Sequence, residues 1–367
     1  MIALLGMFTL RRFVMIAAAA LPSRPRTGAF EPSVAVIVAV KNEAERLPQL
    51  LAALDGIAYS PGKTCFVVVN DGSRDTTGSI LGCWAAARPN ARYLESAQSV
   101  GKAQALNSAL RAAPPSELVA VYDADLTPDA DSLRILAAAF LDPQVAAATG
   151  YRRPSNAGRS PVAAYGALES FVHQLITQAG KDRLALNPTT LGGNCAYRRA
   201  ALGEIGGFRA GALSEDVEVS LALVEAGWRT RFCPEAVAES PTVESLRRYW
   251  NQRSRWTRGL YRSSARTRRL EGLLVSAGYL DRLVFLAALA LAAAGLLRYA
   301  WPALYLSGPA AAAGCALWRA GLGMKITAYV LLSTLPMFAV DVAVTVAATV
   351  NALLGRRQKW FTGAPPA

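Results

Sequence analysis

The stretch ELVAVYDAD, residues 117–125, is an apolar, β-branched run that ends on two carboxylates, Asp123 and Asp125. This composition predicts a buried strand. Side chains at i and i+2 of a strand share a face, so both carboxylates are expected to enter one space at the strand's C-terminal end. Carboxylate oxygens suit Mg²⁺ or Mn²⁺, usually together with substrate phosphates. The pattern predicts a hard-cation site, and a solvated loop with two acids is the alternative.

Charge is distributed unevenly along the 367 residues, whose formal net charge is +13. Most charged residues precede Glu271, and the last hundred or so residues are mainly Ala, Leu, Val and Gly. This division is typical of a soluble domain attached to a membrane segment. The arginines concentrate between Arg247 and Arg269, directly before the first long apolar run. That position favours the cytosolic edge of a membrane over a nucleic-acid partner.

The residues available for metal or nucleophile chemistry are few. His173 is the only histidine, in a sequence typical of an ordinary helix, so a His-based triad or zinc site is disfavoured. The five cysteines form no CxxC pair. We interpret them as reduced packing residues in a cytosolic setting.

Two further apolar runs precede residues 117–125 and also end on polar tips. Residues 34–40 end at Lys41-Asn42-Glu43, and residues 65–69 end at Asn70-Asp71-Gly72-Ser73. A segment with helical spacing follows each tip, which predicts a parallel sheet with helical crossovers. Ligands of such sheets bind at the carboxyl ends of the strands. The three tips are therefore expected at one edge, as a nucleotide site.

Two helix starts add charged groups. Lys102 follows Gly101 at a predicted helix N-terminus, and a helix N-terminus beside a cation is a natural neighbour for phosphate. Asp216, in Ser214-Glu215-Asp216, opens a helix that is expected to run to about Ala226. Acids in a first turn can be an ordinary helix-dipole preference. The functional interpretation is that Asp216 is a general base.

The basic segment before the apolar region contains Gln252, Arg255 and Trp256. These residues are spaced i, i+3 and i+4 and share one face of a helix. Such a face can hold a diphosphate with arginine and stack a sugar on tryptophan. An interfacial helix whose tryptophans lie at the level of the lipid headgroups is the alternative.

Apolar runs at residues 283–297, 299–318 and 326–354 predict two or three membrane helices. Residues 1–21 are also apolar, but Arg11 and Arg12 disfavour a simple span and favour an interfacial helix or a start site placed too early.

The sequence leaves open on which side of the membrane the C-terminus lies. The basic segment 247–269 and the terminal Arg356, Arg357 and Lys359 both favour the cytosolic side, which requires an even number of crossings. Either the 299–318 segment re-enters the membrane or the C-terminus lies on the far side.

Taken together, these motifs resemble the membrane-bound family 2 glycosyltransferases, which include cellulose, chitin, hyaluronan and poly-N-acetylglucosamine synthases. The resemblance runs from about Val34 to Arg258. It is carried by five motifs in order: Asn42-Glu43, Asn70-Asp71-Gly72-Ser73, Asp123-Ala124-Asp125, Ser214-Glu215-Asp216 and Gln252-Arg253-Ser254-Arg255-Trp256.

The resemblance implies a GT-A fold and a role for each motif. Glu43 and Asp71 would contact the nucleobase and ribose of the donor, with Lys102 and Asp123 near its phosphates. Asp123 and Asp125 would hold Mg²⁺ or Mn²⁺, and Asp216 would take the acceptor proton. The remaining three residues would bind the acceptor or the diphosphate: Gln252, Arg255 and Trp256.

Two positions depart from the family pattern. Asn70-Asp71 replaces two consecutive aspartates, and Ser214-Glu215-Asp216 replaces the usual Thr-Glu-Asp. The first change concerns the nucleobase contact, and the second keeps the proposed base.

The expected organisation is a mostly parallel α/β sheet of GT-A type, with helices on both faces, followed by transmembrane helices. The boundaries are 1–32 for an N-terminal segment and linker, 33–245 for the GT-A domain, 246–275 for basic interfacial helices, 276–355 for the transmembrane region and 356–367 for a tail.

The expected function is inverting transfer from a nucleotide-sugar donor, a UDP-sugar in the first instance, to a polysaccharide or lipid acceptor. It would take place at the cytosolic face of the cell's inner membrane, in a homo-oligomer or with an accessory subunit. The alternatives are a single glycolipid transfer and a non-catalytic membrane scaffold.

Overall fold

A computed structural model of the chain describes residues 1–22, 30–266 and 270–354, with the backbone alone for residues 260 and 262–280. These residues form two compact units. The sheet unit comprises residues 30–153 and 187–241, and the helical unit comprises residues 1–22, 154–186 and 242–354. Residues 154–186, which the sequence places within 33–245, are thus grouped with the C-terminal helices. The expected tail at 356–367 lies outside the described residues.

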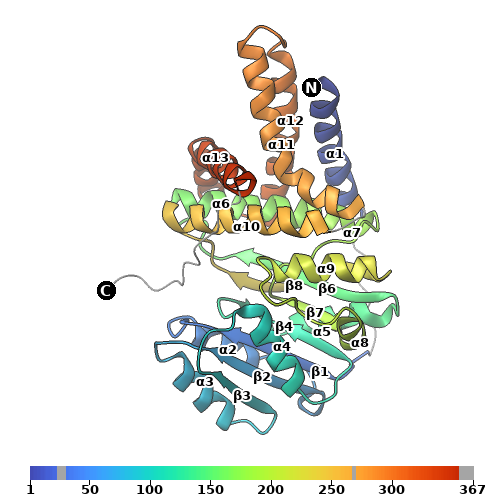
Figure 1. Cartoon of the computed structure of the whole chain (residues 1–367), viewed down its shortest axis with the longest axis vertical. Helices are drawn as coiled ribbons and strands as arrows, with labels where there is room; N and C mark the ends of the chain where they lie inside the picture. Colours follow the sequence, from blue (N-terminus) through green and yellow to red (C-terminus); the bar gives the residue numbers. More distant parts are fainter. Residues whose placement is uncertain (23–29, 267–269, 355–367) are drawn as a thin grey trace. The chain divides into compact units, whose positions relative to one another are not determined.

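The sheet unit is built on one mixed sheet of eight strands in the order β3-β2-β1-β4-β7-β6-β8-β5 (Figure 1). Strands β3, β2, β1 and β4 run parallel, whereas β7 pairs antiparallel with β4 and β6, as β5 does with β8. The strands are β1 (Val34–Val40), β2 (Thr64–Asp71), β3 (Ala91–Ser96), β4 (Leu118–Val121), β5 (Thr127–Pro128), β6 (Val145–Pro154), β7 (Cys195–Arg198) and β8 (Arg229–Ser240).

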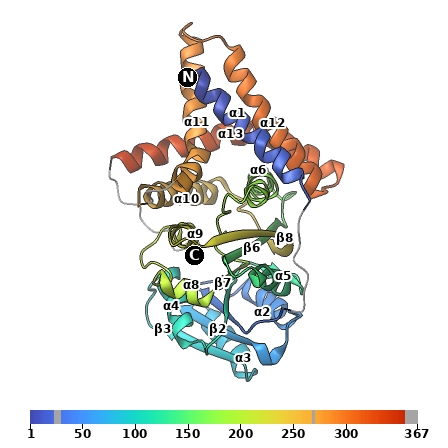
Figure 2. The same ribbon diagram turned by 90° about the vertical axis from the view of Figure 1, so that its right-hand side faces the viewer.

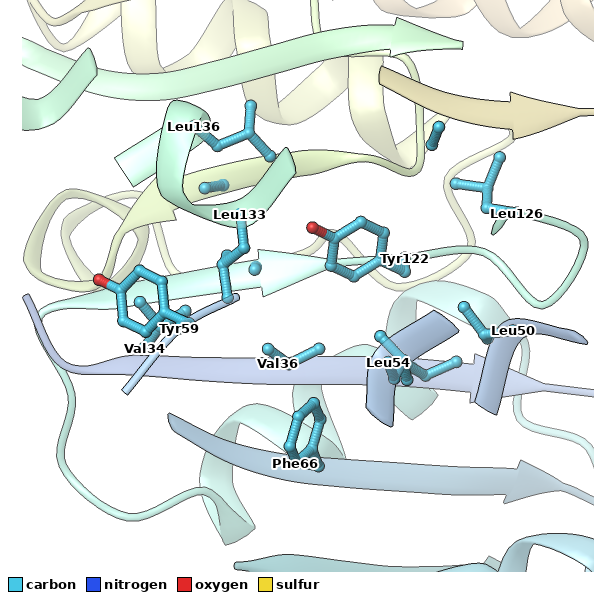
Figure 3. Close-up of a cluster of buried hydrophobic side chains, with 14 of the residues drawn as sticks. Val34, Val36, Leu50, Leu54, Tyr59, Phe66, Tyr122, Leu126, Leu133 and Leu136 are labelled. Atoms are coloured by element: carbon cyan, nitrogen blue, oxygen red, sulfur yellow. The ribbon is translucent and has the colours of Figure 1, made fainter. Parts of the chain in front are cut away.

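Successive side chains of β1 point to opposite faces of the sheet. Both faces of the parallel strands are apolar, and helices cover each of them. Val36 packs in a core with α2, α3 and α5, and Figure 3 shows its neighbours from α2 and α5. Ile37 packs on the other face with α4, α8 and α9. The helices are α2 (Leu47–Asp55), α3 (Thr77–Ala86), α4 (Lys102–Ala112), α5 (Ser132–Ala138), α8 (Arg199–Glu204) and α9 (Glu215–Glu225). Two 3₁₀ turns, Pro61–Lys63 and Ala139–Leu141, complete this unit.

The helical unit consists of α1 (Ile2–Ala20), α6 (Pro161–Phe171), α7 (Ala179–Arg183), α10 (Leu246–Arg266), α11 (Leu270–Ala293), α12 (Ala300–Ala320) and α13 (Met324–Leu353). A π-helical segment, Val172–Gln178, joins α6 to α7 and contains His173, so this stretch is not the ordinary helix that the sequence indicates. In the described part of the chain, α1 and α13 are long and apolar enough to cross a membrane.

One of the two arginines that disfavour a simple membrane span by α1 is paired with an acid in this unit. Arg12 forms an ion pair with Asp281 of α11 and lies over the ring of Tyr305 in α12. A paired arginine carries a smaller burial penalty than an isolated one.

The predicted strands at 34–40 and 65–69 correspond closely to β1 and β2. Strand β6 continues to Pro154 and so includes the polar residues Arg152 and Arg153. The sequence pattern does not predict strands β3, β7 and β8. No residue of β3 is fully buried, and in β8 buried residues alternate with half-exposed ones, so no continuous apolar run marks these strands.

Close backbone packing around Gly150 gives a stability test. A Cβ at this position would lie 2.2 Å from the Ala236 carbonyl oxygen and 2.4 Å from Asn194 Nδ2. We expect Gly150→Ala to destabilise the protein by about 1–3 kcal/mol, because overpacking forces the backbone to shift. Gly82→Ala is the matched control, since a Cβ there meets nothing within 4 Å. In the interior of α3 it should stabilise by about 0.5–1 kcal/mol. Thermal unfolding of both purified variants should shift in opposite directions, and equal shifts would contradict the packing argument.

Candidate active site

The polar tips of the parallel strands lie together at one edge of the sheet. Strand β1 pairs with both β2 and β4, so the residues that follow these three strands are neighbours. The Asn42 backbone amide donates to Ser73 Oγ at 3.0 Å, and the Arg74 amide donates to Asn42 Oδ1 at 2.8 Å. Glu43 lies in the same tip, where its backbone amide donates to Thr77 Oγ1 at 3.0 Å. The first two tips are therefore tied to each other.

Asp71 is buried at the end of β2, and its carboxylate holds the loop before α4. It accepts hydrogen bonds from the backbone amides of Val100 at 2.7 Å and Gly101 at 3.1 Å, and from Ser99 Oγ at 2.8 Å. Gly101, with a φ of 89°, adopts a conformation that favours glycine and caps α4. Lys102 is the first residue of that helix. The hydrogen bonds of Asp71 therefore fix the backbone position from which the Lys102 side chain extends. A direct contact of Asp71 with the donor stays a prediction.

Asp123 and Asp125 follow β4 in a turn rather than within the strand. They nevertheless share one space, because the Arg152 guanidinium lies 3.5 Å from Asp123 Oδ2 and 3.9 Å from Asp125 Oδ1. Burial raises the pKa of Asp125, and the positive charge of Arg152 opposes that rise. Arg152 itself is anchored by donating to the Leu191 carbonyl at 2.7 Å.

Lys102 is the centre of the ionic contacts. Its Nζ lies 2.6 Å from Asp123 Oδ1 and 2.8 Å from Glu215 Oε1, and it donates to the Gly192 carbonyl at 3.3 Å. Burial lowers the pKa of Lys102, but the two carboxylates outweigh it and hold that pKa above its ordinary value. The ammonium is therefore charged and links β4 to the start of α9.

Asp216 reaches the same place from α9. A Cβ built on Gly192 would lie 3.3 Å from Asp216 Oδ2, 3.5 Å from Lys102 Nζ and 3.6 Å from Asp123 Oδ2. Three charged groups from three separate elements thus surround one point of the backbone. Burial raises the pKa of Asp216 to about 6, and the negative charge of Glu215 adds to the rise. A partly buried carboxylate with a raised pKa suits a general base.

The structure therefore brings together Lys102, Asp123, Asp125 and Asp216, which the sequence singled out. It adds Arg152 and Glu215, which the sequence motifs do not mark as site residues. Glu215 stands in a quoted motif without a role of its own, and Arg152 lies in none of the quoted motifs. The sequence signal for Arg152 is its place at the end of β6, among the other strand ends.

Gln252, Arg255 and Trp256 lie on α10 in the helical unit, and their role at the acceptor stays a prediction. Within this motif Arg253 has defined contacts. Its guanidinium lies 2.5 Å from Glu169 Oε2 of α6, and 4.7 Å from the centre of the Trp256 ring. The side chain of Trp256 is thus held in part by a residue between the predicted ones.

Among the described residues, no three His, Cys, Asp or Glu side chains are grouped as a metal site. Asp123 and Asp125 offer oxygen ligands of the kind that Mg²⁺ and Mn²⁺ prefer. Their shared contact with one guanidinium indicates that the two carboxylates can serve one cation. A hard ion held by two carboxylates needs further oxygens, which substrate phosphates commonly supply. The residues present fit such an ion.

Comparison with known proteins agrees with this geometry. Residues 32–259 match the model of the glycosyltransferase-like family 2. The chain belongs to this family. The predicted recognition and the predicted enzyme class, a glycosyltransferase, are confirmed.

Curated relatives match over the same region. The chain is 30% identical over 239 residues to the probable glycosyltransferase YdaM of Bacillus subtilis, covering 62% of this chain and 55% of that protein. It is 27% identical over 228 residues to a poly-beta-1,6-N-acetyl-D-glucosamine synthase of Staphylococcus aureus, covering 61% of this chain and 53% of that protein. The matches span about half the length of these relatives.

A solved structure supports the fold. A mannosyltransferase of Pyrobaculum calidifontis, in complex with GDP-Man and Mn²⁺, superposes with a TM-score of 0.66 at 23% identity, covering 97% of each chain. At this identity the likeness concerns the fold. The predicted GT-A fold is confirmed, and its sheet is mixed, with the parallel half carrying the tips described above.

The raised pKa of Asp216 predicts a pH-dependent stability difference. An unfolded aspartate titrates near 3.9, so a folded pKa of about 6 penalises the ionised folded state above that pH. The penalty disappears as the pH falls through 6 towards 4. Because Asp216 keeps some contact with water, we expect Asp216→Asn to stabilise the protein by about 1–2 kcal/mol at pH 8 and by nothing near pH 4.

Glu225→Gln is the control, because this residue is exposed at the other end of α9. Thermal unfolding between pH 4 and pH 8 should show a growing difference for Asp216→Asn and a flat one for Glu225→Gln. A flat profile for both variants would show that burial does not raise the pKa of Asp216.

Proposed function

We propose that the protein transfers a sugar, with inversion, from a nucleotide-sugar donor to a growing polysaccharide or a lipid-linked acceptor at the cytosolic face of a membrane. The observation that carries this proposal is the convergence of Lys102, Asp123 and Asp216 around Gly192. Family membership gives the reaction class, and this convergence supplies the groups that the reaction needs.

In the proposed reaction, the Asp216 carboxylate removes the proton from an acceptor hydroxyl. The acceptor oxygen attacks the anomeric carbon, and the bond from that carbon to the diphosphate oxygen breaks. Positioning a base within hydrogen-bond reach of the hydroxyl is what such a step requires. No covalent enzyme intermediate is needed, so a single displacement inverts the configuration.

Lys102 and Arg152 are the cations that we assign to the leaving diphosphate. Negative charge grows on this group as the bond breaks, and fixed positive charges favour that change. A Mg²⁺ or Mn²⁺ ion held by Asp123 and Asp125 would supply further charge stabilisation when bound. Lys102 is held in place before substrate arrives, by Asp123 and Glu215, so little reorganisation is required.

The exposed apolar side chains of the helical unit support a membrane location. Examples are Leu10 at 65%, Leu296 at 75% and Leu332 at 79% exposure. Exposed apolar surfaces of this kind mark interaction with lipid or with another protein. The basic α10 suits the anionic cytosolic face. The Staphylococcus relative's name favours a polymer product, and the size of labelled product distinguishes a polymer from a single glycolipid transfer.

The proposed base is tested by Asp216→Asn with Glu225→Gln as control. Purified full-length protein is screened with nucleotide sugars and Mn²⁺ or Mg²⁺, and the release of nucleoside diphosphate is measured. We expect Asp216→Asn to lower kcat by at least about 100-fold, because general-base catalysis contributes that much. Donor affinity should stay within a few-fold of the wild type. Wild-type turnover in Asp216→Asn would refute the assignment of the base. Absence of diphosphate release with every donor in the wild-type protein would favour the scaffold alternative.

The metal assignment is tested by direct binding of Mn²⁺. We expect Asp125→Asn to weaken Mn²⁺ binding in the presence of nucleoside diphosphate by at least about tenfold, since a carboxylate ligand is lost. Asp129→Asn is the control, because this aspartate lies four residues away and its side chain is 50% exposed. Electron paramagnetic resonance of free Mn²⁺ gives the affinity without an activity assay. Equal affinities of the two variants would exclude Asp125 as a ligand.

A further inference from the structure

The longest apolar helix, α13, poses a problem of topology. Its 30 residues, Met324–Leu353, are long and apolar enough to cross a bilayer. A crossing would place Asp341, which lies in the second half of the helix, well inside the hydrocarbon. A charged residue at the centre of a bilayer costs about 2.5–3.5 kcal/mol on insertion scales. The contacts of Asp341 therefore bear on how α13 lies.

Asp341 is almost fully buried, with 3% of its side chain exposed, and it is well paired. Arg282 of α11 donates from Nε to Asp341 Oδ2 at 2.5 Å, and the Tyr249 hydroxyl of α10 lies 2.9 Å from Asp341 Oδ1. The same hydroxyl lies 2.9 Å from Glu169 of α6, and Glu169 pairs with Arg253. This charged cluster, made by Glu169, Tyr249, Arg253, Arg282 and Asp341, ties α13 to α6, α10 and α11.

One of these partners cannot enter the hydrocarbon. Helix α10 carries seven arginines and no acid in its 21 residues, so inserting it would add the penalty of each arginine in turn. Helix α13 meets α10 twice, through Asp341 with Tyr249 and through the hydroxyls of Thr349 and Tyr261 at 3.0 Å. Those contacts are eight residues apart on α13. This half of α13 therefore stays on α10 for more than two turns.

The two faces of α13 differ in what they contact. A buried stripe at helical spacing packs inside the helical unit: Ser333, Met337, Asp341, Val344 and Ala348. On the opposite face, the exposed fractions of Leu332, Leu335 and Leu353 are 79%, 80% and 83%. Because Asp341 and Thr349 hold α13 against α10, the apolar outer face is left to contact lipid along the membrane surface.

Helices α11 and α12 have a different arrangement. They form a hairpin closed by residues 294–299, in which Phe285 stacks on Tyr305 at 5.1 Å. Within the helical unit, Figures 1 and 2 show that this hairpin projects away from α6 and α10, whereas α13 runs across the hairpin's direction. Leu296, at the hairpin's tip, is 75% exposed. With 1.5 Å of rise per residue, the tip lies about 20 Å beyond Asp281.

We propose that α13 lies in the membrane surface, with Leu332, Leu335 and Leu353 in the lipid, and that the α11–α12 hairpin is the part of the C-terminal region that enters the bilayer. The inference rests on the membrane location proposed above. A hairpin returns the chain to the side from which it started. The basic α10 and the terminal Arg356, Arg357 and Lys359 then lie on one side, as the charge rule for cytosolic segments requires.

Spin labels measure the depth of each helix directly. The full-length protein is inserted into lipid vesicles, with its five native cysteines replaced, and one label is placed at a time. On α13 the sites are Leu332, Leu335, Val350 and Leu353, and on the hairpin they are Leu289, Leu296 and Leu304. Relative accessibility to oxygen and to a water-soluble nickel chelate reports depth.

We expect the four α13 labels to lie at similar, shallow depths of about 5–10 Å. The hairpin labels should become deeper towards Leu296. A spanning α13 would instead carry Leu332 and Leu353 to opposite surfaces, about 30 Å apart along the helix. That result would overturn the proposal. Water access at every site, hairpin included, would overturn the membrane location as well, so the two failures are distinguishable.

A second measurement does not depend on removing the cysteines. An epitope tag follows Ala367 in otherwise native protein, and a second tagged form of the protein carries the epitope in the surface turn at residues 88–90. In sealed vesicles of one orientation, both tags should be accessible to protease from the same side. Access from opposite sides would refute the proposed return of the chain.

Discussion

The contact of one ammonium with two carboxylates determines how this site can work. Lys102 lies between Asp123, at the end of a central parallel strand, and Glu215, in the first turn of α9. Without that positive charge, the carboxylates of Asp123 and Asp216 would lie beside Gly192 with less to offset their mutual repulsion. Like charges at such a distance raise one another's pKa values and destabilise the fold. The lysine therefore makes it possible for these carboxylates to lie close together.

The position of Lys102 depends in turn on the backbone before it. Asp71 uses both carboxylate oxygens to bind the amides of Val100 and Gly101, which fixes the start of α4. An aspartate that the family resemblance assigns to the donor is thus also a support for the lysine. Two strand ends and two helix starts meet through these contacts. This arrangement gives the sheet edge charged groups whose places are set before any substrate binds.

The helical unit follows the same physical rule in an apolar setting. Asp341 is buried, Glu169, Arg253 and Arg282 are partly buried, and each charge has an opposite charge beside it. Burying a single one of these groups would carry a large penalty, whereas a paired cluster is tolerated. Arg12 and Asp281 make a second pair of this kind. Such pairs explain how apolar helices that carry arginines and aspartates can pack together.

The sequence by itself determined the alternation of strands and helices, the three polar tips and the family, because these depend on local periodicity and on short motifs. The runs at 34–40 and 117–121 could be predicted because a strand buried on both faces is continuously apolar. Only the tertiary structure decided strands β7 and β8, the contacts of Arg152 and Glu215 in the site of Lys102, and the charged cluster around Asp341. Each of these depends on partners that are far apart in the chain, Glu215 lying more than a hundred residues from Lys102, and no local pattern records which distant charge will neutralise which.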